Sequence, residues 1–196
     1  MEQNNAQSDL EFIKKIISDS KRVVEADGKT FIFWGILVAI GLLLTYFFAN
    51  SSYGNVTGWL WIGLILFGWL YTFITEKKTA KKQRAITFAS KILAATWISL
   101  GLAMTIIAFI GPISGAFSPI YTSPILSVIL GIGYIISGVV LAKKWFSFLA
   151  AGWWIGAIAM FFMANLETLI IMAFMMILFQ TIPGIILFKE IGRIEQ

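Results

Sequence analysis

The chain has 196 residues, of which 59% are hydrophobic and 13% are charged. Soluble domains carry roughly 25% charged residues, so this composition excludes an ordinary soluble fold and indicates a membrane protein. The net charge of +5 favours contact with anionic lipid headgroups over nucleic-acid binding, because a nucleic-acid reading would require a folded basic domain. The chain has neither cysteine nor histidine, which excludes disulfides, thiolate nucleophiles and thiolate or imidazole metal ligands.

A polar arm, residues 1–29, precedes the apolar part of the chain. Apolar residues recur at helical spacing through 10–24, Ser8 and Glu11 have the spacing of a capping box, and Gly28 is placed to end a helix. We therefore predict a cytoplasmic amphipathic helix that lies in the headgroup layer. The alternative is that this helix packs under the bundle or on a soluble partner.

Long charge-free runs define the membrane-spanning part. Residues 30–75 and 92–142 are each long enough for two helices, and 145–166 and 168–188 for one each, because about 20 apolar residues cross a bilayer core. Clusters of turn formers divide both long runs. The sequence predicts an all-α integral membrane protein with a six-helix transmembrane domain over 30–188, its helices lying near 31–49, 58–75, 92–110, 120–142, 146–164 and 168–188.

The basic residues predict the orientation of the chain. All fifteen Lys and Arg fall in the arm, in the loop 76–91, at 143–144 or in the tail 189–196. Lys and Arg near helix ends resist translocation, so we predict that both termini and the short tail are cytoplasmic. Glu167 is then the one formal charge on the opposite side.

Parts of the sequence echo each other. "GLLLTYFFAN", which starts at Gly41, resembles "GAIAMFFMAN", which starts at Gly156, and a weaker copy starts at Gly101. Because each copy opens a pair of helices that returns to the same side, we predict three tandem hairpins forming a parallel repeat. The alternative is chance similarity within a small apolar alphabet.

Small residues and aromatic residues mark helix contacts and depth. Helices in lipid associate by close packing over glycine, and Gly152 and Gly156 form one small-xxx-small pair. Trp59 and Trp61 are expected at the outer headgroup level. Gly35, Gly63 and Gly131 are further candidates for contact beside the main predicted set, which is Gly41, Gly68, Gly101, Gly138, Gly152 and Gly156.

The predicted helices contain little that could do chemistry. No ionisable residue lies in a helix interior, so an ion or proton pathway is not indicated, and we predict no catalytic, metal or cofactor site. One polar cluster is notable, because Pro183 removes a backbone donor and kinks the last helix beside Gln180 and Thr181. Two interpretations are open: a kink whose freed backbone carbonyl is hydrogen-bonded locally, or a polar site on a transport path.

Three phrases, "GLLLTYFFAN", "ILGIGYIISGVVLAKK" and "AAGWWIGAIAMFF", resemble the small six-helix bacterial membrane proteins grouped with the acid-resistance protein HdeD. The resemblance covers chiefly 31–50 and 129–165. It implies a bacterial inner-membrane protein linked to envelope or acid stress, and it carries over no functional residue.

Two functions are compatible with these observations. The first is a non-catalytic scaffold or stress-associated interaction protein, with a second copy, a membrane protein or a cytoplasmic protein as its partner. The second is a channel or transporter for a neutral or apolar small solute. A dry interior packed over glycine favours the first, and a water-wide path lined by Thr, Ser and Gln180 favours the second.

Overall fold

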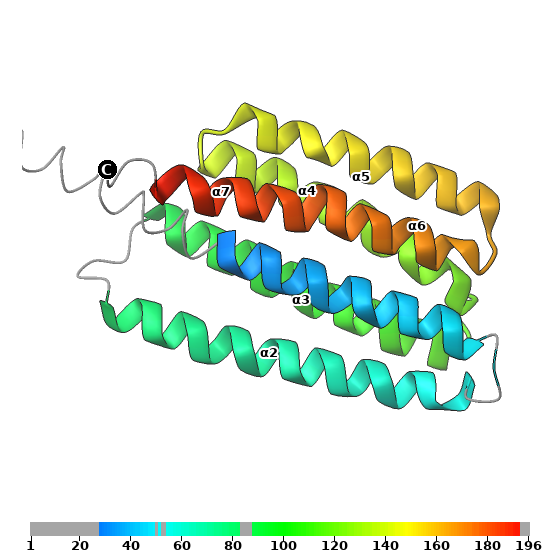
Figure 1. The fold of residues 1–196 in the computed structure, drawn as a ribbon. Helices are drawn as coiled ribbons and strands as arrows, with labels where there is room; N and C mark the ends of the chain where they lie inside the picture. Colours follow the sequence, from blue (N-terminus) through cyan, green and yellow to red (C-terminus); the bar gives the residue numbers. More distant parts are fainter. Residues whose placement is uncertain (1–27, 50, 52–53, 83–87, 193–196) are drawn as a thin grey trace, which may run out of the picture.

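The computed structural model describes residues 28–49, 51, 54–82 and 88–192. Helices joined by short turns make up these residues, which contain no strand. The helices run alternately up and down along one long axis (Figure 1). Most of the predicted arm and the end of the predicted tail lie outside the described residues.

Among the described residues, six helices are long and apolar enough to cross a membrane, which confirms the predicted number and order of spans. The first is Gly28–Ala49. It is followed by α2 (Thr57–Lys82), α3 (Phe88–Ile113), α4 (Thr122–Val140) and α5 (Lys144–Met163), with 3-10 turns at Gly54–Val56 and Pro119–Tyr121. The sixth span is built from α6 (Glu167–Met175), a π-helix (Met176–Thr181) and α7 (Ile182–Gly192).

The cytoplasmic connection predicted at 76–91 is shorter than expected. The α2 helix continues to Lys82 and α3 already begins at Phe88. Lys, Glu and Ala are strong helix formers, so the helix does not have to stop where its apolar part ends. Gly28 is likewise helical, although it was expected to end a helix.

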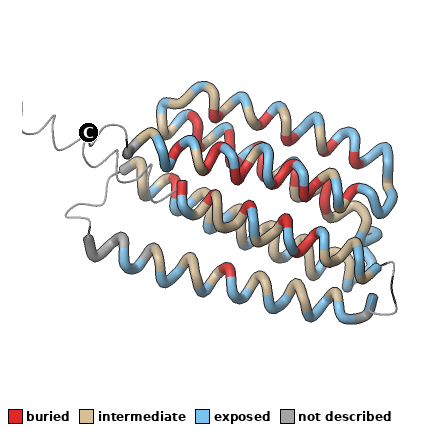
Figure 2. Tube along the Cα trace, in the orientation of Figure 1, coloured by how far each residue is buried: buried red, intermediate tan, exposed pale blue. Residues whose placement is uncertain are grey.

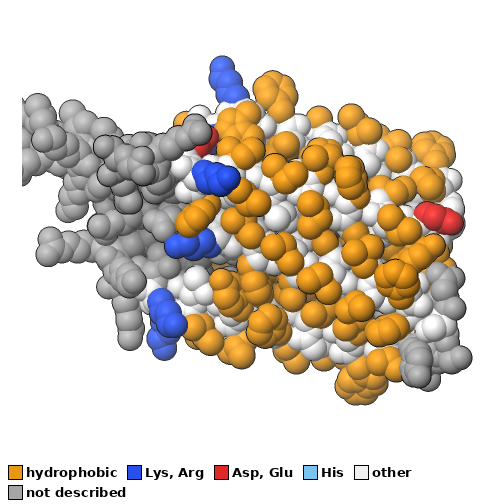
Figure 3. All heavy atoms as spheres, viewed as in Figure 1, with side chains coloured by type: hydrophobic (Ala, Val, Ile, Leu, Met, Phe, Trp, Pro, Cys, Tyr) orange, Lys and Arg blue, Asp and Glu red, His pale blue; other side chains and the backbone are white. Residues whose placement is uncertain are grey.

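Burial is uneven across the six spans. In Figure 2 the buried residues gather on the first helix, α4, α5 and the sixth span, while α2 lies at the margin of the bundle. Among the described side chains of α2, only Gly68 is buried. Large apolar side chains cover the outer surface along the length of the bundle (Figure 3).

Charge is separated along the bundle axis. Basic side chains appear at one end of the face shown in Figure 3, and an acidic side chain lies at the other end. At the basic end, Lys143 forms an ion pair with Glu190, and Lys29 Nζ lies 5.2 Å from the centre of the Phe188 ring. The ends of a long apolar bundle are where its charges can stay hydrated.

Candidate functional site: glycine notches and the Tyr134 cluster

A repeated device joins the first four helices. We call it a glycine notch: a glycine with Thr or Ser four residues later on the same helix face, and with a tryptophan of a neighbouring helix against the glycine. A Cβ added to any of these glycines would come within about 3.0 Å of that indole ring, so the glycine is what lets the ring approach this closely. The notches, with their tryptophans, are Gly41/Thr45 (Trp61), Gly68/Thr72 (Trp34), Gly101/Thr105 (Trp69) and Gly133/Ser137 (Trp97).

Three of the four tryptophans also bond to the hydroxyl of their notch. An indole N–H that is left unpaired in lipid costs free energy, and the hydroxyl one turn beyond the glycine is within its reach. Thr45 and Thr105 hydroxyls in turn donate to the carbonyl of their own notch glycine. The donor–acceptor distances are 2.9 Å for Trp34 to Thr72, 2.9 Å for Trp61 to Thr45 and 3.0 Å for Trp97 to Ser137.

Trp59 and Trp61 therefore have different environments. The Trp59 side chain is 74% exposed at the edge of α2, where a headgroup-level anchor would lie. Trp61 instead packs against Gly41 of the first helix. Trp59 and Trp61 lie near the same end of α2 but on different faces of the helix. Their position in the sequence therefore could not predict that only one of them packs against another helix.

The other predicted glycines lie against neighbouring helices in the second half of the bundle. A Cβ on Gly138 would lie 2.5 Å from the Ser147 backbone nitrogen, and one on Gly152 would lie 2.6 Å from the Phe179 ring. Gly156 meets the Met175 side chain. Gly63 is different, because a Cβ there meets nothing within 4 Å, so the expectation of a contact at Gly63 is wrong.

Close contacts at Gly28, Gly133 and Gly184 were not predicted. A Cβ on Gly28 would lie 3.0 Å from the Gly184 carbonyl oxygen, which brings the first helix and α7 backbone to backbone. The notch at Gly133 has a sequence signal, since Ser137 follows four residues later. The contact between Gly28 and Gly184 has no such signal, because its partners are far apart in the chain.

A cluster of aromatic rings fills the space between four helices, and we name it the Tyr134 cluster. Tyr134 of α4 is fully buried. Its ring centre lies 4.7 Å from that of Phe146, 5.6 Å from Phe31, 5.8 Å from Trp153 and 6.0 Å from Trp97. These rings come from the first helix, α3, α4 and α5, so the cluster ties four spans together.

The predicted polar site lies where the sixth span changes its helical register. Pro183 has no N–H and its ring crowds the carbonyl one turn earlier, and the turn before it is a π-helix. The Ile182 N–H donates to the Ile177 carbonyl, and the Thr181 hydroxyl donates to the Met176 carbonyl at 3.2 Å. Gln180 is only 5% exposed, so the wide turn carries an amide into the protein.

Three buried polar atoms lack a hydrogen-bond partner among the described residues: Tyr134 Oη, Trp153 Nε1 and Gln180 Oε1. The Trp153 carbonyl, by contrast, accepts a bond of 2.7 Å from the Ser127 hydroxyl. Within the described part of the chain, no group of three or more acidic, Cys or His residues is placed to hold a metal ion.

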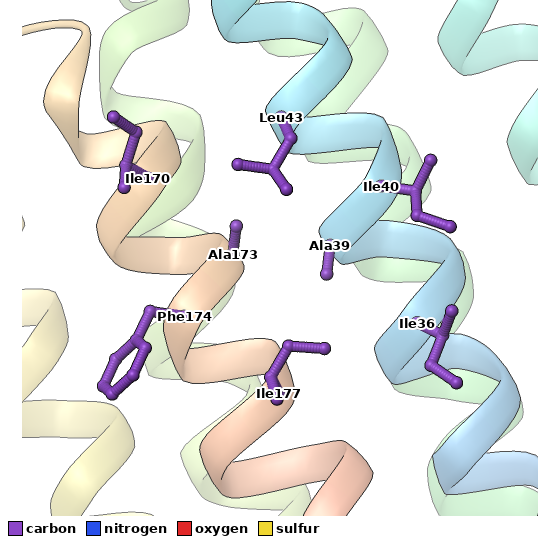
Figure 4. Close-up of a pocket in the computed structure, with 8 residues that line it drawn as sticks. All are labelled: Ile36, Ala39, Ile40, Leu43, Ile170, Ala173, Phe174 and Ile177. Carbon is purple, nitrogen blue, oxygen red and sulfur yellow. The ribbon is translucent and has the colours of Figure 1, made fainter.

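An apolar groove of about 320 Å³ opens between the first helix and the sixth span. Figure 4 shows Ala39 and Ala173 between the two helices, with Leu43 and Ile177 pointing into the gap. The helices are close at Gly35 and Thr181, where a Cβ on the glycine would lie 3.0 Å from the threonine nitrogen, and the groove begins beyond that contact. Its other lining residues are Ile36, Ile40, Ile170 and Phe174.

Six apolar spans with an apolar surface are consistent with an integral membrane protein. No protein-family model, curated protein or solved structure matches the chain. The functional argument therefore depends on the residues and contacts described above.

Proposed function

We propose that the chain is a non-catalytic integral membrane protein of the bacterial inner membrane that acts as a scaffold or stress-associated interaction protein. The observation that supports this proposal best is the use of polar side chains inside the bundle. Thr45, Thr72 and Ser137 each accept a bond from a tryptophan of another helix. Hydroxyls used to join helices are not available to line a path for a solute.

The contacts between helices point the same way. Glycines let tryptophan, phenylalanine and backbone atoms of neighbouring helices fill the space between spans, and the centre is occupied by the buried rings of the Tyr134 cluster. A closely packed bundle of this kind is suited to presenting its ends and its lipid-facing surface to partners. The lysines at the basic end suit the anionic headgroups of the cytoplasmic leaflet.

Purified protein in liposomes tests this proposal. Vesicles that contain the protein should take up urea, glycerol and protons at the rates of protein-free vesicles, and vesicles with a known channel provide the positive control. Uptake of any of these solutes well above the protein-free rate would exclude the scaffold and favour the transport function.

A genetic experiment tests the link to stress. Cells of the source bacterium that lack the gene should survive acid shock less well, and the full chain should restore their survival. A chain without residues 1–26 should insert normally and fail to restore it, because the proposal assigns the interaction to the cytoplasmic face. Unchanged survival of the deletion strain would refute a role of the protein in acid stress.

A channel or transporter for a neutral or apolar solute is the second candidate. The unpaired polar atoms of Tyr134, Trp153 and Gln180 favour it, as does the apolar groove. If the liposomes show solute uptake, Gln180→Leu should abolish that uptake while leaving the helical content unchanged.

We also propose that the first two hairpins are copies of one unit. The notch at Gly68/Thr72 takes Trp34 from the helix before it, and the notch at Gly133/Ser137 takes Trp97 in the same way. In both hairpins the indole bonds to the residue four positions after the glycine. This shared geometry supports the repeat more strongly than sequence similarity within an apolar alphabet does.

A further inference from the structure

The three residues whose buried polar atoms are unpaired lie at similar depths along the bundle axis. Tyr134, Trp153 and Gln180 belong to α4, α5 and the sixth span, whose basic ends are at Val140, Lys144 and Glu190. At about 1.5 Å per residue, the three residues lie roughly 9, 14 and 15 Å from those ends. The depths of the three residues therefore differ by at most about 6 Å.

The contacts of its neighbours give the direction of Gln180. Phe179 packs against Gly152 of α5, and Thr181 packs against Gly35 of the first helix. Leu178, on another side of the turn, is 37% exposed. The Gln180 side chain leaves the helix between the first two directions, and its burial shows that it points into the bundle.

Trp153 connects this position with Tyr134. Its ring centre lies 5.9 Å from that of Phe179 and 5.8 Å from that of Tyr134. Tyr134 Oη and Trp153 Nε1 are both buried, and neither makes a hydrogen bond of normal geometry. On the other side of Tyr134 lies Phe31, which is packed against Gly184, one turn beyond Gln180.

The three groups are complementary in chemistry. The indole N–H only donates, the amide Oε1 only accepts, and the phenol hydroxyl does both. Buried polar groups without partners are strongly disfavoured in a low-dielectric interior, and buried waters commonly make about three hydrogen bonds to such groups. We propose that Tyr134, Trp153 and Gln180 hold one water molecule, which accepts from Trp153 Nε1–H and Tyr134 Oη–H and donates to Gln180 Oε1.

This site gives the π-turn a role. A wide turn changes the direction of the side chains that follow it, and such turns recur at functional positions. Here the turn from Met176 to Thr181 presents Gln180 to the interior, between the contacts with α5 and the first helix. The bound water then joins the sixth span to α4 and α5 at the level of the Tyr134 cluster.

Nuclear magnetic resonance of the full chain in detergent micelles, with ¹⁵N-labelled tryptophan, tests the proposal. The indole proton of Trp153 should show a direct cross-peak to a long-lived water, with its assignment confirmed by loss of the signal in Trp153→Phe. Trp154 is the matched control, because it is the next residue and its indole donates to the Val128 carbonyl at 3.2 Å. Its proton should show no such cross-peak, and absence of the cross-peak at Trp153 would overturn the proposal.

Two variants separate a bound water from proton exchange through the phenol. In Tyr134→Phe the cross-peak should persist, since Trp153 and Gln180 still hold the water, whereas loss of the peak in this folded variant would overturn the proposal. In Gln180→Met the peak should weaken, because the water keeps two donors but loses the only group that accepts its protons; an unchanged peak in this folded variant would overturn the proposal. Thermal unfolding gives a second readout. Removing a group that bonds to the water should lower the apparent Tm by several degrees, whereas removing a hydroxyl that has no partner would raise the Tm. A higher Tm for Tyr134→Phe would therefore also overturn the proposal, and Tyr121→Phe, at the edge of α4, is the control.

Discussion

Replacing Gly138 by alanine should separate α4 from α5 at one point and destabilise the bundle. The added Cβ would clash with the Ser147 hydroxyl oxygen, and it would lie 2.5 Å from the Ser147 nitrogen and 2.9 Å from its Cα. Carbon contacts are comfortable at about 3.5 Å, so the two backbones must move apart by roughly 1 Å. A change of rotamer can move the hydroxyl, but the other two atoms belong to the main chain and no change of rotamer can relieve their clash.

Two opposing effects determine the size of this change. Overpacking a close-packed site costs about 1–3 kcal/mol, and exchanging glycine for alanine inside a helix regains up to about 1 kcal/mol. Gly138 lies in the last turn of α4, which ends at Val140, so the regained part is small. We expect a net loss of about 2 kcal/mol, which corresponds to a Tm lower by about 4–8 °C for a chain of this size.

Thermal unfolding in a mild detergent, followed by near-ultraviolet circular dichroism, measures this loss. The matched control is Gly63→Ala on α2, where the added Cβ meets nothing within 4 Å, and its Tm should be unchanged or higher. Adding Ser147→Ala to the Gly138 variant removes the hydroxyl but leaves the main-chain clash, so it should restore less than half of the loss. Full restoration by Ser147→Ala would refute the reasoning, and so would equal Tm values for the two glycine variants.

Three further predictions concern other parts of the chain. Trp97→Phe removes the donor to Ser137 and should lower the free energy of unfolding by about 0.5–1.5 kcal/mol, as measured by the same assay; an unchanged Tm would mean that the notch bond contributes nothing. A single cysteine at the exposed Ser114 should react with an impermeant maleimide added to intact cells, whereas one at Thr79 should react only after permeabilisation. The reverse pattern would show that the chain has the opposite orientation in the membrane. Deleting residues 1–26 should leave the bundle's Tm within about 2 °C of the full chain if the arm lies on lipid; a sharp drop would show that it packs on the protein.

The spans and their order were predictable because their signals are local. A charge-free run of sufficient length must cross the bilayer as a helix, since no water is present to satisfy its backbone. The ends of the helices were less predictable, as α2 shows by continuing to Lys82. The apolar run ends at the membrane, whereas a helix ends only where its residues stop favouring helical geometry.

The contacts between spans were much harder to predict. Gly63 and Gly68 are glycines of the same apolar helix, yet one faces open space and the other receives Trp34. Both faces of α2 are apolar, so no periodic pattern indicates which one meets protein and which one meets lipid. The tertiary structure decided this through the position of the first helix.

The sequence by itself determined that six helices are long and apolar enough to cross a membrane, where each one lies in the chain and that charges flank them, because these properties follow from runs of neighbouring residues. Tertiary structure alone decided that Trp34, Trp61 and Trp97 bond across helices and that Gln180 turns inward toward the layer of Tyr134 and Trp153. The three tryptophan bonds alone join partners up to 40 positions apart along the chain. In lipid, where hydrophobic burial does not distinguish one helix face from another, close packing and hydrogen bonds between such partners select the arrangement.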